Sequence, residues 1–253
     1  MKIGFIGTGN MASSIILGLI NTGYNPANIW VTNRTMAKAE KFAKYKVNVV
    51  STSEEVIANS DTILLGMKPD GYKPWLDTYS IEGKKIISIG AGITSQFMKN
   101  YTDNFVITMP NTPSKLCYGS TLIVESDTVT PEVLAVFEAI GKAHLIKEEE
   151  LDVYTLVTGC SPAYFFSFVA NMSEVLSSQY NLDEHVVNDM LIQVLNGSGA
   201  MLNVDPNPKQ LCDKVCSPGG ITIEVVNHLN KDLPDTFKAG FDAAIKRTNE
   251  MKN

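Results

Sequence analysis

The feature that most constrains the fold is a glycine-rich segment near the start of the chain, Gly7–Ala12 (GTGNMA). It follows a short apolar run and opens a segment with helical periodicity, which is the fingerprint of a dinucleotide-binding βαβ unit. Gly7 allows the tight turn, Gly9 lets the backbone approach a diphosphate, and Ala12 lets the helix pack closely on the strand. The amides at the helix start carry the positive end of its dipole, so we expect them to face the diphosphate.

Short β-branched runs alternate with amphipathic segments up to about residue 145, the pattern of a parallel sheet with crossover helices. This predicts an α/β, Rossmann-type domain. The expected strands are Lys2–Ile6, Asn28–Thr32, Val47–Val50, Thr62–Leu65, Lys85–Ile89, Val106–Met109, Thr121–Val124 and Ala143–Ile146. We expect Thr121–Val124 to be a candidate for antiparallel pairing at an edge. The expected helices begin near Asn10, Met36, Ser53, Tyr72, Thr94 and Pro131.

The pattern changes near Lys147–Glu150, beyond which helical periodicity dominates. The expected helices are Leu151–Val157, Ala163–Tyr180, Glu184–Leu202, Pro208–Cys216, Gly220–Asn230 and Pro234–Met251. The sequence therefore predicts two domains: a dinucleotide-binding domain over 1–148 and an all-α domain over 149–253. The many apolar faces of the second domain suggest that it needs a partner surface, and dimerisation through it is the hypothesis.

Charge and composition exclude several classes of protein. The 253 residues carry a net charge of −6 and no long basic run, which argues against a nucleic-acid partner. The spacing of the four cysteines suits no zinc site, so no metal is expected. We find no signal peptide and no run of about 18 apolar residues, so we expect a cytoplasmic protein without a membrane span.

The end of the second expected strand indicates which dinucleotide binds. NAD-binding proteins usually have Asp or Glu at this position, which binds the ribose hydroxyls. This chain has Asn33-Arg34-Thr35 and no carboxylate. The planar fork of Arg34 can accept a 2′-phosphate, with Asn33 and Thr35 adding hydrogen bonds. NADPH is therefore the predicted cofactor.

Few residues suit acid–base catalysis on a carbonyl. The chain has three histidines, no HExxH motif and no Tyr-x-x-x-Lys pair. No lysine occurs between Lys147 and Lys209, where β-hydroxyacid dehydrogenases normally carry their catalytic lysine. These absences weigh against carbonyl–alcohol chemistry, which needs a proton donor or acceptor.

One polar segment in the helical half, Val215–Thr222, can bind a small carboxylate. Ser217 is the expected N-cap of a helix and Pro218 its first residue. Gly219 and Gly220 would leave the first-turn amides unshielded, which suits an anion. The Thr222 hydroxyl would lie within reach of the same ligand. Taken by itself, the segment would be better explained as an ordinary capped helix after a loop.

Four stretches of the chain form a recognisable set: GFIGTGNMA at Gly4–Ala12, SIGAGI at Ser88–Ile93, MPNTP at Met109–Pro113 and SPGGIT at Ser217–Thr222, with weaker matches at Lys68-Pro69 and Thr158–Tyr164. Through them, the chain resembles the pyrroline-5-carboxylate reductase family along nearly its whole length. The resemblance implies reduction of 1-pyrroline-5-carboxylate to L-proline, the last step of proline biosynthesis. From the residues after the second expected strand, NADPH is expected to be preferred over NADH. The resemblance also implies a helical dimerisation domain, often assembled into larger rings.

The resemblance assigns roles residue by residue. Ser217, Gly219 and Gly220 would hold the substrate carboxylate beside Val215, and Thr222, the candidate catalytic residue, would hydrogen-bond the ring nitrogen. The residues that would line the cofactor are Gly7, Thr8, Gly9, Asn10, Met11, Asn33, Arg34, Lys68, Pro69 and Asn111. A protonated imine accepts hydride directly, so this chemistry needs no catalytic histidine or lysine.

Departures from the family pattern leave the ring substituent of the substrate open. Ile107 stands where the family often has Arg, Cys160 and Ser161 replace Ser and Gly, and Asp70 replaces Gln or His. One alternative is an NADPH-dependent reductase of another small imine or carbonyl acid. The other is a non-catalytic NADP(H)-binding regulatory protein that kept the scaffold.

Overall fold

The computed structural model describes residues 1–252 and contains two compact units. The first comprises Met1–Pro162 together with the terminal residues from Ile245 onward, and the second comprises Ala163–Ala244. The units divide the chain at Pro162, and the domain boundary near residue 148 stays a prediction.

The first unit is built on one eight-stranded sheet in the order β3-β2-β1-β4-β5-β6-β7-β8. The strands are β1 (Ile3–Ile6), β2 (Ile29–Thr32), β3 (Asn48–Val49), β4 (Thr62–Leu65), β5 (Lys85–Ser88), β6 (Phe105–Met109), β7 (Gly119–Val124) and β8 (Gly141–Ile146). Every strand expected from the sequence is present, with ends that differ by one or two residues. The first six strands are parallel, as the alternating pattern predicts.

β7 runs antiparallel to β6 and parallel to β8. Its antiparallel pairing was expected, but its place at the edge was wrong, because β8 is the edge strand. Residues 110–118 connect β6 to β7 through only a short 3-10 helix. A parallel return needs a crossover of about a dozen residues or more, so the short connection imposes the antiparallel turn.

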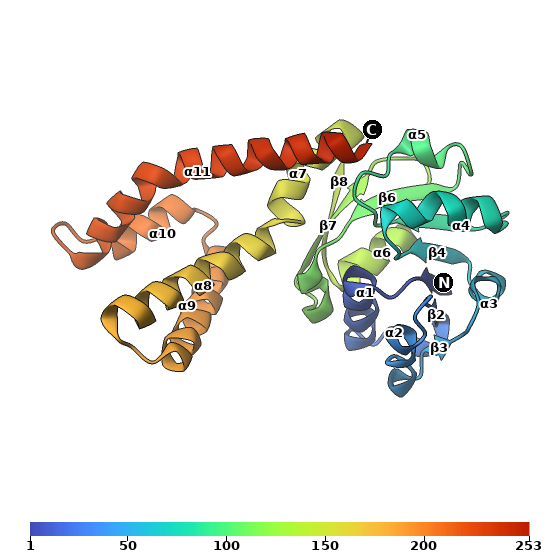
Figure 1. Ribbon diagram of the computed structural model, residues 1–253, viewed down its shortest axis with the longest axis horizontal. Helices are drawn as coiled ribbons and strands as arrows, with labels where there is room; N and C mark the ends of the chain where they lie inside the picture. Colours follow the sequence, from blue (N-terminus) through green and yellow to red (C-terminus); the bar gives the residue numbers. More distant parts are fainter. Residues whose placement is uncertain (253) are drawn as a thin grey trace. The chain divides into compact units, whose positions relative to one another are not determined.

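Short helices cover both faces of the sheet (Figure 1). They are α1 (Asn10–Asn21), α2 (Ala37–Glu40), α3 (Ser53–Asn59), α4 (Tyr72–Thr78), α5 (Ser95–Met98), α6 (Pro131–Ala139) and α7 (Leu151–Thr158), with 3-10 helices η1 (Pro26–Asn28), η2 (Ala43–Tyr45), η3 (Pro69–Gly71), η4 (Thr112–Leu116) and η5 (Glu148–Glu150). Each helix expected in this half begins within one residue of its predicted start.

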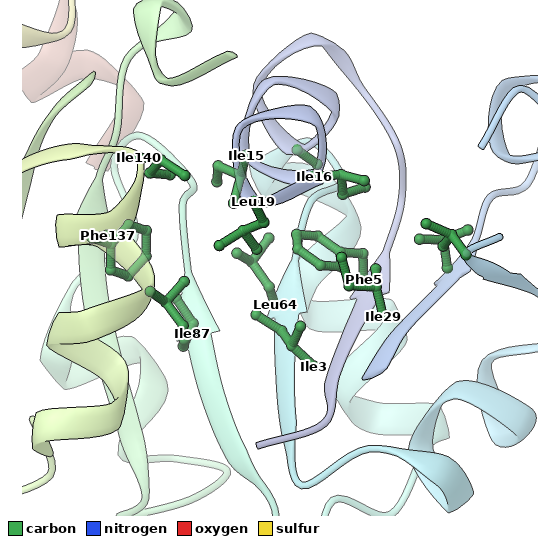
Figure 2. Packing of buried hydrophobic residues seen from close by; sticks show 14 of the residues in the cluster. Ile3, Phe5, Ile15, Ile16, Leu19, Ile29, Leu64, Ile87, Phe137 and Ile140 are labelled. Carbon is green, nitrogen blue, oxygen red and sulfur yellow. The ribbon is translucent and has the colours of Figure 1, made fainter. Parts of the chain in front are cut away.

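Two apolar cores lie on opposite faces of the sheet, because successive side chains on a strand point to opposite faces. On one face, α1 and α6 pack over Phe5, Leu64 and Ile87 (Figure 2). On the other, α3 and α4 pack over Ile63 and Leu65. Burial on both faces explains why these strands are nearly continuous apolar runs in the sequence.

The second unit is helical. Its elements are the part of α8 (Ser161–Tyr180) that follows Pro162, α9 (Glu184–Val204), α10 (Pro208–Val215) and the part of α11 (Ile221–Lys252) that precedes Ile245. Within it the rings of Tyr164 and Phe241 lie 6.2 Å apart, so α8 and α11 contact each other. Few of its side chains are buried, and Val187 is its one buried apolar side chain among the described residues.

The expected break between Asn230 and Pro234 is wrong, because α11 runs through both positions as one helix. Proline removes the N–H that would bond to the Asn230 carbonyl. Asn230 and Pro234 are both exposed, so water can satisfy that carbonyl and the ring meets no packed neighbour on the solvent side. The exposed position of Pro234 therefore explains why the helix continues through it, although the local pattern predicts a break.

The helical half exposes large apolar side chains. Phe166, Met190 and Val194 are each more than 60% exposed. By length and composition alone, the helical stretch Glu148–Tyr180 could cross a membrane, because an 18-residue window within it has a mean hydropathy of 1.3 and only 11% of that window is buried. No such stretch was expected from the sequence. Exposed apolar side chains gathered in this way are typical of surfaces that contact a partner.

Candidate active site

The fingerprint segment forms the turn that its glycines predict. Gly7 has a φ of +96° and donates its N–H to the Thr32 carbonyl at 2.9 Å. A Cβ on Gly7 would lie 2.9 Å from the Met67 nitrogen, so a side chain there would clash with backbone. Gly9 is the N-cap of α1 and, having no side chain, leaves the first-turn amides uncapped.

These uncapped amides fit a dinucleotide diphosphate. The first turn of α1 holds no acidic residue that would repel an anion. The start of the helix carries a partial positive charge and free N–H groups, which together bind phosphate. The diphosphate is therefore compatible with the residues present at Gly9, Asn10 and Met11.

A further glycine, Gly66, completes this turn, and the sequence analysis did not single it out. A Cβ on Gly66 would lie 2.4 Å from the Gly7 carbonyl oxygen and 2.7 Å from the Ala12 Cβ. Ala12 is fully buried, so the close packing expected of it is made against the end of β4. The signal was a glycine directly after a buried strand, but recognising it required knowing that β4 lies beside β1.

Asn33, at the end of β2, uses its carboxamide within the chain. Its Oδ1 accepts the Thr8 N–H at 3.1 Å, and its Nδ2 donates to the Thr35 carbonyl at 2.8 Å. Behind the fingerprint, Lys41 donates to the Ser13 hydroxyl at 3.0 Å, and that hydroxyl donates to the Thr8 carbonyl at 3.1 Å. Asn33 therefore fixes the turn next to the cofactor segment instead of presenting a free amide.

Arg34 is exposed beside this turn and has no ion-pair partner among residues 1–252. The nearest residues in the chain, Asn33 and Thr35, are uncharged. An unpaired guanidinium at this strand end matches a 2′-phosphate, to which it can donate two parallel hydrogen bonds.

Tyr72 links the ends of two strands and was also missed. Its hydroxyl donates to the Leu65 carbonyl at 2.7 Å and accepts the Ile89 N–H at 3.3 Å. Burial raises the pKa of Tyr72 to about 12, so the hydroxyl stays protonated and remains a donor. In the sequence, Tyr72 lies in an ordinary helical pattern. Its contact with the SIGAGI segment forms only in the folded chain.

Asn111 is buried and joins three elements. Its Nδ2 donates to the Thr158 carbonyl and its Oδ1 accepts the Ser120 N–H, both at 2.9 Å. Lys68 and Pro69 follow β4, where the Gly71 N–H donates to the Lys68 carbonyl at 2.9 Å and forms η3. Any contact of these three residues with a cofactor stays a prediction.

The sheet brings the predicted cofactor residues of the first unit to one edge. Gly7 follows β1, Asn33 follows β2, Lys68 follows β4 and Asn111 follows β6. The carboxyl ends of parallel strands meet at this edge, where doubly wound folds bind ligands. Of the departures, Ile107 is 2% exposed and packs in the sheet core, so its side chain has no access to a ligand.

The predicted substrate segment lies in the second unit and differs from the expected cap. The Gly220 N–H donates to the Ser217 carbonyl at 3.0 Å, and Gly219 has a φ of +70°. These values describe a β-turn with Pro218 and Gly219 at its centre. The positive φ of Gly219 cannot continue into a helix, so α11 begins at Ile221 and Ser217 as its N-cap was wrong.

The turn remains open to a ligand. Ser217, Gly219 and Thr222 are exposed, and Val215 is 63% exposed. Within residues 1–252, the Thr222 hydroxyl has no hydrogen-bond partner. The amides that follow Gly220 are still at a helix start, so the segment can bind an anion although its cap differs from the expected one.

Comparison with known proteins identifies both halves. Residues 148–251 match the family described as pyrroline-5-carboxylate reductase dimerisation, and residues 2–92 match the family described as NADP oxidoreductase coenzyme F420-dependent. Pyrroline-5-carboxylate reductase of Escherichia coli (strain K12) is 33% identical, covering 96% of this chain and 93% of the relative. The Arabidopsis thaliana enzyme of that name is 31% identical, covering 99% and 95%.

Solved structures agree. Plasmodium falciparum pyrroline carboxylate reductase with NADP bound superposes with a TM-score of 0.88 at 26% identity, covering 100% of this chain and 98% of that one. The Coxiella burnetii pyrroline-5-carboxylate reductase gives 0.83 at 28% identity, with the same coverage. An imine reductase from Myxococcus stipitatus, at 17% identity and a TM-score of 0.57, shares the fold alone.

Proposed function

The chain belongs to the pyrroline-5-carboxylate reductase family, and from that premise we propose how its own residues divide the work. Its activity is the NADPH-dependent reduction of 1-pyrroline-5-carboxylate to L-proline. The observation that carries this is the full-length identity of 33% to a relative of that name, joined to the match over the helical half. The two alternatives weighed from sequence have no specific observation in their favour.

The cofactor residues act by position and charge. NADPH, when bound, supplies the hydride. The amides of Gly9, Asn10 and Met11 bind its diphosphate, and Arg34 with the Thr35 hydroxyl binds the 2′-phosphate. Asn33 is a positioning residue, because its hydrogen bonds to Thr8 and Thr35 keep these two sites in a fixed relation. Lys68, Pro69 and Asn111 line the same edge of the sheet.

The substrate residues hold an anionic ring. The carboxylate binds at the Ser217–Gly220 turn and the amides that follow it, and the Thr222 hydroxyl hydrogen-bonds the ring nitrogen. The nitrogen is protonated before reduction, which makes the adjacent ring carbon electrophilic. Catalysis then consists of orientation and charge stabilisation, for which backbone donors and one hydroxyl are sufficient.

The chain forms a homodimer through its helical half. The exposed side chains of α8 and α9, among them Phe166 and Met190, supply the apolar surface of that contact. We further propose that dimers assemble into a larger ring and that the enzyme acts in the cytoplasm. The exposed apolar stretch Glu148–Tyr180 is then covered by protein and not by lipid.

The activity is tested by following NADPH oxidation with 1-pyrroline-5-carboxylate. A six-membered cyclic imine carboxylate and a 2-oxo acid serve as competing substrates. We expect the five-membered imine to give the highest kcat/KM. Faster turnover of another acid would favour the first alternative, and NADPH binding without turnover of any of them would favour the regulatory protein.

The substrate site is tested by Thr222→Ala. Loss of a hydrogen bond made in the transition state should lower kcat/KM by about 10- to 100-fold while the Kd for NADPH stays unchanged. The matched control is Thr236→Ala, which removes an exposed hydroxyl from the same helix, and it should leave the kinetics unaltered. If Thr222→Ala behaved like this control, Thr222 would have no place in the site.

A further inference from the structure

Two cysteines lie immediately before the predicted substrate turn, with their sulfur atoms 3.9 Å apart. Cys212 is in α10, and Cys216 is the first residue after it, in an extended conformation. Both side chains are half-buried and both are free thiols. No third metal-ligating side chain joins them within the described residues, so their shared chemistry is that of a dithiol.

We propose that Cys212 and Cys216 are a redox modification site, whose oxidation to an intramolecular disulfide distorts the Ser217–Gly220 turn and weakens substrate binding. The effect on catalysis rests on the proposed function of that turn. Formation of the disulfide does not, because it depends only on the two sulfur atoms and a small-molecule oxidant.

Closing the bond requires the backbone to move. Cβ atoms four residues apart on a helix are about 5–6 Å apart, whereas a disulfide needs about 3.5–4.5 Å. The start of α10 is fixed by the Asn207 side chain, which accepts the Gln210 N–H at 3.1 Å. Its last turn is tied by the Lys214–Asp205 ion pair at 3.1 Å.

The backbone movement that closes the disulfide is therefore expected at Cys216 and not within α10. Cys216 already lies outside the helix, and its backbone is held to it by the hydrogen bond from its N–H to the Cys212 carbonyl at 3.1 Å. Ser217 is the next residue and supplies the carbonyl that closes the turn. Drawing Cys216 toward Cys212 displaces Ser217 and with it the amides proposed to bind the carboxylate.

The reaction balances with a peroxide as oxidant. The thiolate of one cysteine attacks a peroxide oxygen, the O–O bond breaks, and a sulfenic acid forms as water leaves. The other thiol attacks the sulfenic sulfur, the S–O bond breaks, and a second water leaves with the disulfide formed. Two electrons pass from the two sulfur atoms to hydrogen peroxide, and a dithiol reductant reverses the reaction.

The surroundings of Cys216 set its response to pH. Desolvation, with smaller contributions from Cys212 and Asp213, raises the pKa of the Cys216 thiol. The thiolate is the reacting form, so a raised pKa keeps Cys216 protonated at neutral pH. Disulfide formation should accordingly become faster as the pH rises above neutral.

The modification is tested by treating the full-length protein with hydrogen peroxide, alkylating the remaining thiols and digesting with trypsin. The two cysteines fall on different tryptic peptides, 210–214 and 215–231, so the disulfide appears as a linked pair that separates on reduction. Non-reducing electrophoresis at the chain mass shows that the bond is intramolecular. If both peptides were recovered alkylated while other thiols were oxidised, the proposed site would be refuted.

The consequence is tested by kinetics on the same samples. Oxidation should raise the KM for 1-pyrroline-5-carboxylate by about tenfold or more, the loss expected for one hydrogen bond to a charged group. The Kd for NADPH should not change, and dithiothreitol should restore the KM. Cys212→Ser should have normal activity and resist peroxide, whereas Cys117→Ser, which removes a thiol of the first unit, should remain sensitive.

The possible outcomes distinguish failure of the disulfide proposal from failure of the proposed function on which its effect on catalysis rests. A linked peptide pair with an unchanged KM would overturn the regulatory effect. Equal sensitivity of Cys212→Ser and the unmodified sequence would overturn the assignment to this pair. A reduced protein that does not oxidise NADPH with the imine would refute the proposed function, while the peptide result would still decide whether the disulfide forms.

Discussion

At the residue scale, the proposed specificity for NADPH depends on one guanidinium, that of Arg34. Arg34 follows β2 with no carboxylate beside it and no ion-pair partner in the described part of the chain, so its charge is available to a phosphate. The structure adds that Asn33, its neighbour, is committed to Thr8 and Thr35. Discrimination against NADH is therefore expected to come chiefly from Arg34.

Replacing Arg34 with alanine should raise the KM for NADPH by about 10- to 100-fold, the equivalent of about 1.5–3 kcal/mol for hydrogen bonds to a charged group. The KM for NADH, which has no 2′-phosphate, should change little. Steady-state kinetics with both cofactors measure this, and Lys99→Ala, which removes an exposed cation directly after α5, controls for the loss of one positive charge. Equal effects on both cofactors would remove Arg34 from the phosphate site.

A second test at the residue scale uses two glycines in opposite surroundings. Gly66→Ala forces a Cβ into the Gly7 carbonyl and Ala12, and overpacking of this kind should lower the free energy of unfolding by about 1–3 kcal/mol. Gly240→Ala, in a helix with open space around it, should raise that energy by about 0.5–1 kcal/mol. Urea denaturation compares them, and destabilisation by both would contradict the account.

At the scale of secondary-structure elements, the strands were predicted correctly, because buried parallel strands are recognisable in the sequence as apolar β-branched runs. The two errors in the helical half came from local signals that have two physical outcomes. Ser217-Pro218 can start either a helix or a turn, and Gly219 after it favours the turn. Pro234 can end a helix or lie on its exposed side. Gly66 and Tyr72 were missed because their contacts join elements distant in sequence.

The continuity of α11 predicts the effect of Pro234→Ala. Alanine restores an N–H for the Asn230 carbonyl and removes the helix-interior penalty of proline, which is about 3 kcal/mol. The unfolded chain also gains conformational freedom without proline, which offsets about 1 kcal/mol of this stabilisation. Thermal unfolding at fixed protein concentration should show a gain of about 2 kcal/mol. Asn227→Ala, on the same helix, should give less than about 1 kcal/mol. A loss of stability at Pro234→Ala would indicate that the helix needs its proline.

At the scale of the whole molecule, the exposed apolar side chains of the helical half predict that this half needs a partner to be stable. Only Val187 is a buried apolar side chain in the second unit as described, too little for an independent core. We therefore expect a partner subunit to supply the missing surface, and folding of this half to be coupled to association.

Size-exclusion chromatography with light scattering should therefore give at least twice the chain mass at micromolar concentration. Phe166→Glu places a charge on the apolar surface of α8, where the side chain is 66% exposed, and should shift the protein toward monomer. Tyr118→Glu, at an exposed aromatic of the first unit, is the matched control and should leave the dimer intact. A monomeric protein, or dissociation caused only by the control, would refute the dimer contact.

The most direct test of the account is a crystal structure of the dimer with NADP⁺ and L-proline bound. We expect the proline carboxylate at the main-chain donors that follow Ser217, the Thr222 hydroxyl at the ring nitrogen, and the ring carbon facing the nicotinamide of the same or the partner subunit. Proline bound elsewhere, or a turn remote from every nicotinamide in the assembly, would contradict the proposed site.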